Sequence, residues 1–501
     1  MRKLESLHRT TGRVIVTAML VGLLGACLGS PPPRPAAPVT PVSDWCRGML
    51  GELDELAAFL GIGFAESRRI EDFPYLRVTR PLQGLREHLS SRARFDAWVS
   101  QLAQADRTAR DTELAQLAQR VPDLPDYEAM RERVDGCRAA LIEQELQSPA
   151  TQARLIRNAE VADDYSTLAR TLGLYPLTRF ALQMGVDGYQ QSVRELYAAP
   201  LPAGVPTVAW SAAGGERVAL SAREVSGWID RASDNALRLP EFSDAQWRAL
   251  AVTHAPTLWV EQASRADRIG APAWKTGQPA LHVDTRQPTV YYRTGFAEFG
   301  RRFLPQISYV AWFPERPKSS AIDPYAGRFD GVIWRVTLGV DGLPLSYDTI
   351  HPCGCFHLFF TPRRVALRAP EPGTEAVLSP QAEVPDGPVA VRISSSDHMV
   401  SRVVRSQDVK ADEYRAYALE DWQRLNLMPD GRGGVASLFR AEDGIVPGSE
   451  RLERFYLWPS GVRSPGAMRS WGHHATAFIG RRHFDDPKLL CEVIACPSSL
   501  R

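Results

Sequence analysis

The chain has 501 residues, which is long enough for two or more domains with a substantial core. Its 59 Lys and Arg residues nearly balance its 58 Asp and Glu residues, and the lack of a basic excess argues against a dedicated nucleic-acid binder. A hydrophobic content of 44%, with 38 prolines and 12 tryptophans, is typical of a globular, loop-rich protein and excludes a disordered chain and a polytopic membrane protein.

The first 26 residues have the features of a secretory signal peptide. Basic residues precede an apolar run over residues 14–25, which is too short for an ordinary transmembrane helix. The run ends in Leu-Gly-Ala-Cys27, a sequence that resembles the lipobox of bacterial lipoproteins. This resemblance implies that residues 1–26 are removed and that Cys27 is lipidated, with palmitate among its acyl chains. Because Leu28 stands where Asp would retain the protein at the inner membrane, it also implies the periplasmic face of the outer membrane. A plain secretory signal or an uncleaved anchor is the alternative.

Residues 27–43 are predicted to form the lipidated cysteine and a proline-rich tether. Six prolines lie between residues 31 and 41, and such a segment is an extended spacer that reaches up to about 45 Å at ~3.1 Å per residue. The expected partner is therefore the membrane, through the lipid anchor, and an envelope protein or polysaccharide is a second candidate. Nucleic acid is not expected as a partner.

Export would place the cysteines in an oxidising compartment, where disulfides form. Without Cys27, six remain, and an even number in an oxidising compartment indicates disulfides. The six candidates are Cys46, Cys137, Cys353, Cys355, Cys491 and Cys496. The first two lie in helical patterns and are expected to pair with each other. The middle two are only two residues apart, which strains a direct bond in an extended backbone, so we predict that they pair with the last two.

Residues 44–200 are predicted to form a helical domain. Apolar residues recur there at three- and four-residue spacing, and prolines separate the segments. The predicted helices span 44–60, 82–104, 107–119, 126–146 and 178–197. Their charged residues are expected on solvated faces.

Residues 201–501 are predicted to form a β-rich α+β domain, mainly antiparallel, with short helices. Two capping boxes, Ser221 with Glu224 and Ser243 with Gln246, predict helix starts. The clearest hairpin runs through Val332–Leu338 and Leu343–Ile350, with Asp341-Gly342 as its turn. Further strands are predicted over 258–261, 290–293, 307–313, 389–394, 399–404 and 455–458, and a helix over 414–427.

Several stretches together resemble an uncharacterised family of proteobacterial lipoproteins. They are Phe73-Pro-Tyr-Leu-Arg77, Leu174-Tyr-Pro-Leu177, Trp312-Phe-Pro-Glu-Arg-Pro317, the segment around His351, and Gly480-Arg-Arg-His-Phe-Asp-Asp-Pro487. The resemblance covers most of the mature chain. It carries no established activity, so it adds nothing to the choice between an enzyme and a binding protein.

The densest chemistry lies between Asp348 and His357. His351, Cys353, Cys355 and His357 fall within seven residues, and the intervening Pro352 and Gly354 predict a bend. A bend could bring two or three of these side chains together, whereas an extended strand would spread them over about 20 Å. Because no standard zinc spacing is matched, a strand end with disulfide-bonded cysteines and packed histidines is the competing interpretation.

A second cluster contains His473, His474 and His483. If the predicted disulfides bring this cluster to the first one, the histidines could share a site. In this hypothesis His351, His357 and His483 are catalytic, while His351, His357, His473 and His474 bind a divalent metal such as zinc.

The functional hypothesis is therefore a histidine-centred, metal-dependent site in an outer-membrane lipoprotein, acting on an envelope substrate. The alternative is a non-catalytic envelope scaffold or binding protein stapled by disulfides. The chain contains no HExxH, GxSxG or Walker-type phosphate loop, which removes the commonest zinc protease, α/β-hydrolase and NTPase interpretations. Convergence of the histidines in a concave pocket would favour the enzyme.

Overall fold

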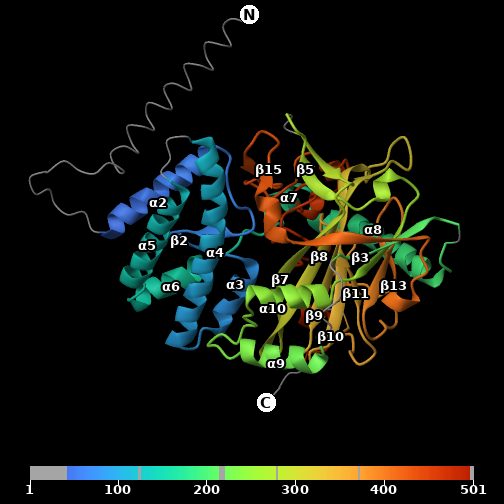
Figure 1. The fold of residues 1–501 in the computed structure, drawn as a ribbon, viewed down its shortest axis with the longest axis horizontal. Coiled ribbons are helices and arrows are strands. Elements are labelled where there is room, and N and C mark those ends of the chain that lie inside the picture. Colours follow the sequence, from blue (N-terminus) through green and yellow to red (C-terminus); the bar gives the residue numbers. More distant parts are fainter. Residues whose placement is uncertain are drawn as a thin grey trace, which may run out of the picture.

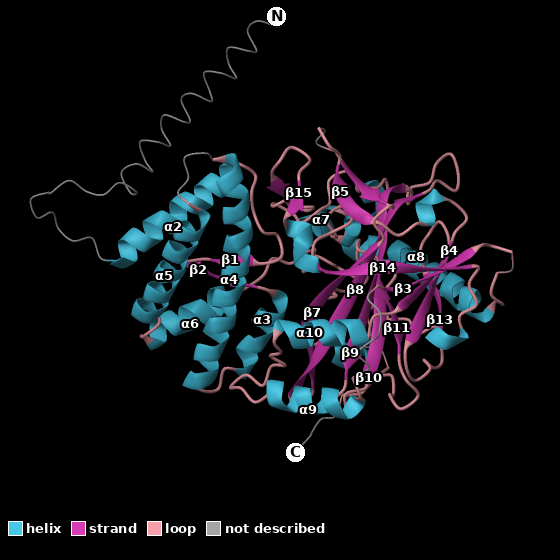
Figure 2. Cartoon of the chain, viewed as in Figure 1, coloured by secondary structure: helices cyan, strands magenta, loops and turns pink. Residues whose placement is uncertain are grey.

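The computed structural model describes residues 42–121, 126–202, 204–213, 220–277, 280–369 and 373–496. The predicted signal peptide, Cys27 and all but the last two residues of the predicted tether lie outside the described residues. Within them the protein is a mixed α+β fold, in which a group of helices stands beside a large sheet (Figure 1, Figure 2). None of the helices in these ranges is both long enough and apolar enough to cross a membrane.

The N-terminal part is helical, as predicted, with one short hairpin that the sequence pattern did not reveal. Its elements are α2 (Val42–Phe59), β1 (Arg68–Ile70), β2 (Phe73–Val78), α3 (Arg80–Gly84), α4 (Arg92–Arg120), α5 (Tyr127–Glu145) and α6 (Pro149–Asn158). The two helices predicted over 82–104 and 107–119 are largely one helix, α4. It begins where the Ser91 side chain accepts a hydrogen bond from the backbone N–H of Arg94, and it contains neither Pro nor Gly.

The charged residues of this part are not all solvated. Five of them form a buried ionic cluster between α4, β2 and α5: Arg77, Asp106, Arg110, Glu113 and Arg138. Arg77 Nη2 lies 2.7 Å from Glu113 Oε2, and Arg138 Nη2 lies 2.8 Å from Asp106 Oδ2. Buried charges persist only when they are paired in this way.

The predicted disulfide between Cys46 and Cys137 is confirmed. Its Cα atoms are 5.3 Å apart, and it ties α2 to α5 within the apolar core of the helical part. The two helices are therefore linked both by packing and by a covalent bond that spans 91 residues of sequence.

The C-terminal part is organised around a ten-stranded sheet. Its strands are β3 (Thr207–Ala212), β4 (Thr257–Glu261), β7 (Thr289–Phe299), β8 (Arg302–Arg316), β9 (Gly327–Leu338), β10 (Pro344–Ile350), β11 (Leu358–Phe360), β12 (Val389–Ile393), β13 (Val400–Arg405) and β14 (Glu413–Asp421). Their order is β11-β10-β9-β8-β7-β14-β3-β4-β12-β13. Only the pairs β14–β7, β14–β3 and β12–β4 are parallel, which confirms the mainly antiparallel class.

Alternating side chains give the sheet two buried faces. Val332, Trp334 and Val336 of β9 lie on one face, which packs against α8 (Tyr175–Ala198), α9 (Ala222–Ala232) and α10 (Asp244–Thr253). Both predicted capping boxes start their helices, α9 and α10. Ile333 lies on the other face, which the C-terminal residues cover.

The remaining elements are short. They are α7 (Thr167–Leu172), β5 (Ala271–Trp274), β6 (Leu281–Asp284), β15 (Met428–Pro429), β16 (Val435–Ala436), α11 (Arg454–Leu457), α12 (Leu489–Val493) and the 3-10 turns η1 (Leu85–His88), η2 (Arg265–Asp267), η3 (Ser406–Asp408), η4 (Trp422–Asn426) and η5 (Trp458–Ser460).

Two predicted elements were wrong in type. The segment predicted as a helix over 414–427 is strand β14 followed by η4. It is extended because its backbone pairs with β3 on one side and with β7 on the other. The strand predicted over 455–458 is the short helix α11 running into η5.

Candidate functional site

The stretch from His351 to His357 is a tight loop between β10 and β11, as the predicted bend requires. The backbone N–H of His351 donates to the carbonyl of Cys355 at 2.9 Å, and that of Gly354 donates to the carbonyl of His351 at 2.8 Å. Gly354 has a φ of +90°, and a Cβ added there would lie 2.3 Å from the carbonyl oxygen of Ala475. Glycine is therefore required, and the loop lies directly against the C-terminal residues.

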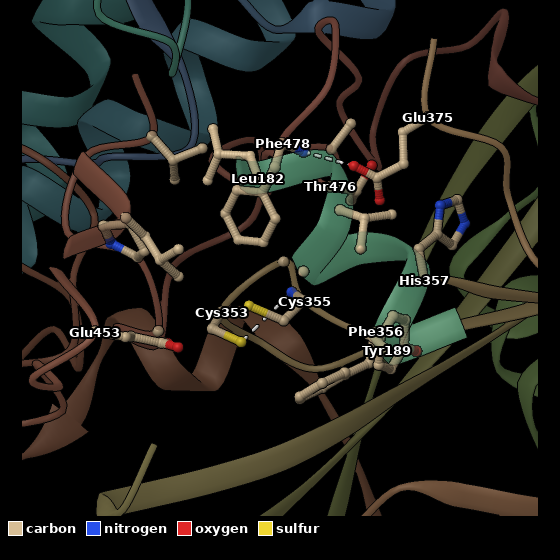
Figure 3. Close-up of a pocket in the computed structure, with 18 of the residues that line it drawn as sticks. Leu182, Tyr189, Cys353, Cys355, Phe356, His357, Glu375, Glu453, Thr476 and Phe478 are labelled. Carbon is tan, nitrogen blue, oxygen red and sulfur yellow. Dashed lines mark hydrogen bonds between the residues drawn. The ribbon is translucent and has the colours of Figure 1, made fainter. Parts of the chain in front are cut away.

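A cavity of about 790 Å³ opens beside this loop (Figure 3). Leu182 and Tyr189 of α8 line one side of it, and Thr476 and Phe478 of the C-terminal segment line another. Its lining is mostly apolar, with a few charged groups. A cavity of this size and character is suited to a small organic ligand or a short stretch of extended chain.

Cys353 and Cys355 are free thiols that both line the cavity. Their side chains lie together in Figure 3, and the backbone N–H of Cys355 donates to Sγ of Cys353 at 3.4 Å. Burial works to raise the pKa of Cys353, but the hydrogen bond from the Cys355 thiol and the charge of Arg451 outweigh it, so this pKa is lowered. The same hydrogen bond, together with burial, raises the pKa of Cys355 well above its ordinary value. The two shifts therefore favour the thiolate at Cys353, which is the more buried of the two thiols.

Two charged residues flank the thiols. Arg451 is 4% exposed and donates to the carbonyls of Tyr325 at 2.7 Å and Phe329 at 2.9 Å. Glu453 lines the cavity, and its carboxylate points toward the Cys353 side chain in Figure 3. Burial raises the pKa of Glu453 to about 7. A carboxyl group that titrates near neutral pH can accept a proton and return it.

His357 lines the cavity but stands apart from the thiols. In Figure 3 it lies on the far side of Cys355 from Glu453. Its Nε2 is 3.1 Å from Oδ2 of Asp348, a carboxylate that also receives two hydrogen bonds from Arg335, its cross-strand neighbour on β9. Burial outweighs the attraction of Asp348 and lowers the pKa of His357. The ring is therefore neutral at pH 7 and is oriented by Asp348.

His351 is held away from the cavity by a buried carboxylate. It is 2% exposed, and its Nδ1 lies 3.4 Å from Oδ1 of Asp330. Asp330 also lies 2.9 Å from Nδ1 of His398 and 3.3 Å from Nη2 of Arg451. Burial works to raise the pKa of Asp330, but the charges of Arg451 and His351 outweigh it and hold this pKa well below its ordinary value. His351 thus belongs to a buried charge network that supports Arg451.

The second histidine cluster mainly joins the C-terminal segment to the helical part. Nδ1 of His473 lies 2.8 Å from Asp164 and its Nε2 lies 2.9 Å from the carbonyl of Ala65. Nε2 of His483 lies 3.5 Å from Asp164, and its ring packs edge-on against Tyr165. His474 is fully buried against Trp471 and Phe484, and burial lowers its pKa to about 3.

The two clusters therefore meet without sharing a site. The backbone N–H of Arg469 donates to the carbonyl of Pro352 at 2.9 Å, so the predicted proximity of the C-terminal segment to the loop is confirmed. However, His351, His357, His473 and His474 have separate partners. Across the described ranges no three His, Cys, Asp or Glu side chains are placed to hold a metal ion. The donor groups that zinc would need are thus dispersed.

The predicted disulfides between the central and C-terminal cysteines were wrong. Cys491 and Cys496 bond to each other, with Cα atoms 5.3 Å apart. Helix α12 ends at Val493, and the chain after it brings Cys496 within bonding distance of Cys491. Closing a loop between residues five apart costs less entropy than closing one to a distant cysteine. Cys353 and Cys355 remain thiols as a consequence.

Sequence reasoning missed several residues around the cavity. Tyr189, Glu375 and Glu453 line it, and Arg451 and His398 belong to the network beneath the loop. Each is an isolated residue in a segment without a motif. Local sequence patterns could not show that these side chains gather around the cavity and beneath its loop.

The fold and the cavity define a class: a mixed α+β protein whose dithiol loop faces an apolar cavity. Comparisons with protein-family models, with curated proteins and with solved structures find no match to this chain. The residues of the cavity are therefore the features of this protein that point to a function.

Proposed function

We propose that the protein is an outer-membrane-anchored periplasmic lipoprotein whose cavity performs thiol–disulfide exchange through Cys353 and Cys355. The observation that carries this proposal is the thiol pair itself. In a fold that holds two disulfides elsewhere, two adjacent thiols with oppositely shifted pKa values line a cavity beside a carboxyl that titrates near pH 7. Such an environment favours thiolate formation at one sulfur and a proton on its neighbour.

The reaction has two exchange steps. The Cys353 thiolate attacks one sulfur of a substrate disulfide, a mixed disulfide forms, and the other substrate sulfur leaves as a thiolate. Glu453 then takes the proton of Cys355, whose thiolate attacks the Cys353 sulfur. The second substrate thiolate leaves and accepts the proton from Glu453. Two electrons pass from the protein dithiol to the substrate, which leaves as one thiolate and one thiol while a Cys353–Cys355 bond forms. The thiolate takes from solvent the proton that Cys353 released when it ionised.

The loop supports the second step. In an extended backbone, residues two apart are near the ~6.8 Å upper limit of Cα separation for a disulfide. The hydrogen bonds of His351 and the positive φ of Gly354 turn the chain and bring the two side chains together. The proposed substrate is a disulfide-bearing envelope protein that inserts an extended segment, or a small disulfide.

A small aromatic disulfide, 2,2′-dithiodipyridine, tests the proposal in the purified full chain. The wild-type chain is expected to release two pyridinethiones and to end two hydrogens lighter by mass spectrometry. Cys355→Ser should release one and retain a mixed disulfide at Cys353, while Cys353→Ser should react much more slowly. Independent reaction of both cysteines, with no bond between them, would contradict exchange.

The apolar lining favours a second candidate, a non-catalytic binding protein for an apolar envelope ligand. The same experiment separates the two, because a binding protein would retain ligand but yield no Cys353–Cys355 bond. The histidine-centred metal site has no comparable support, because its four donors do not converge.

The lipid anchor is supported by the lipobox-like sequence that ends at Cys27. Cys27→Ser is expected to release the protein from the membrane fraction or to leave its signal uncleaved. Normal processing and unchanged membrane association, without attached lipid, would contradict the proposed anchor.

A further inference from the structure

Large apolar side chains stand in solvent along the outer wall of the cavity. We call six of them the apolar rim: Leu172, Leu177, Phe180, Met184, Phe455 and Trp458. Phe180 is 66% exposed and Met184 is 71% exposed. Leu177, Phe180 and Met184 recur at three- and four-residue spacing, so they form one stripe along α8.

The rim residues lie on the same elements that form one wall of the cavity. The same helix that carries the stripe turns Leu182 and Val186 into the cavity, and α11 and η5 contribute Leu457 and Pro459 to its wall. α7 is held against this wall, because Nε of Arg170 donates to the carbonyl of Ser460 at 2.7 Å. The exposed apolar side chains therefore lie on the outer side of the same elements whose inner side chains line the cavity.

The charged residues nearest to the rim are arginines, while Asp187 and Glu195 of α8 lie C-terminal to the stripe. Residues 167–186 and 454–460 contain Arg170, Arg179 and Arg454 but neither Asp nor Glu. Arg170 is engaged with backbone carbonyls, whereas Arg179 and Arg454 are exposed beside rim residues. Apolar side chains with flanking arginines and an interfacial Trp are the combination that binds the surface of an anionic bilayer.

We propose that the apolar rim docks on a lipid bilayer with anionic headgroups, so that the cavity opens toward the lipid and admits an apolar ligand from it. The proposal depends on the rim and not on the reactivity of Cys353. A bilayer covers aliphatic, aromatic and cationic side chains together, which accounts for all three features of this patch. Large apolar patches on a monomer otherwise mark an interface.

Vesicle flotation tests the docking with a chain of residues 28–501, which retains every described element and lacks the predicted anchor. Vesicles of phosphatidylcholine with added phosphatidylglycerol are expected to carry the chain upward. The double variant Phe180→Asp/Met184→Asp should reduce this partition by about 100-fold, because two large side chains lose their lipid contact. Arg179→Glu/Arg454→Glu should reduce binding chiefly to vesicles that contain phosphatidylglycerol.

Phe59→Asp is the matched control, because Phe59 is 68% exposed on α2 of the helical part. It should float like the wild-type chain, and circular dichroism should show that all variants are folded. Failure of the wild-type chain to float, or an equal loss in Phe59→Asp, would overturn the proposal. A wild-type dimer that dissociates in the rim variant without any vesicle binding would also overturn it, in favour of a second copy as the occupant.

Discussion

Removal of the Cys46–Cys137 bond should destabilise the helical part far more than removal of the Cys491–Cys496 bond destabilises the C-terminal end. The first bond closes a loop with a sequence separation of 91, and the second one with a separation of 5. If a disulfide acts by restricting the unfolded chain, the first bond is worth about 4.6 kcal/mol at 25 °C and the second about 2 kcal/mol. The larger value corresponds to a roughly 2000-fold change in an opening equilibrium.

The double variants Cys46→Ser/Cys137→Ser and Cys491→Ser/Cys496→Ser form a matched pair. Hydrogen exchange measured by mass spectrometry reports the opening of α2 and α5 separately from the sheet. In the first variant, amides of α2 should lose protection by about three orders of magnitude, while the second variant leaves them unchanged. A loss of less than about tenfold in α2 would refute the loop-entropy argument, because packing alone would then hold the helix.

Three further predictions concern the cavity and its supports. The pKa of Glu453 is raised from 4.5 to about 7. The free energy of unfolding should therefore be highest below pH 4.5 and should fall by about 3 kcal/mol as the pH rises through about 7. Urea unfolding should show this fall in the wild-type chain and not in Glu453→Gln. Asp348→Ala should lower the free energy of unfolding by about 3–5 kcal/mol, because it leaves the buried Arg335 without its ionic partner. Asp408→Ala breaks an exposed pair with Arg405 and should lower it by less than about 1 kcal/mol. Equal losses in the two variants would contradict this prediction. Gly354→Ala should shift the urea midpoint more than Gly387→Ala, since both have φ near +90° but only the first brings Cβ to 2.3 Å from a backbone oxygen.

Local patterns predicted local structure well. The capping boxes of α9 and α10, the β9–β10 hairpin and the bend at Gly354 depend on residues close together in sequence, and each is present. The Cys46–Cys137 bond was also predictable, because its helices were recognised and few partners remained.

Predictions that depended on long-range geometry did less well. β14 has a helix-compatible sequence, but its hydrogen bonds to β7 and β3 decide its conformation. The histidine clusters were correctly brought together, yet the direction of each ring depends on a partner elsewhere, such as Asp330 for His351 and Asp164 for His473. Glu453 carried no signal, because its pKa is raised chiefly by burial, which exists only in the assembled structure.

The position of β14 has a consequence for how the chain folds. This strand, which ends at Asp421, lies between β7 and β3 and is the only described strand that pairs with both sides of the sheet. Strands β11 to β7 and strands β3, β4, β12 and β13 are thus two separate half-sheets until β14 inserts between them. Contacts this distant in sequence make folding slow. A chain synthesised from its N-terminus would carry two unpaired strand edges until more than four fifths of its length is available, and these edges expose it to aggregation while it folds.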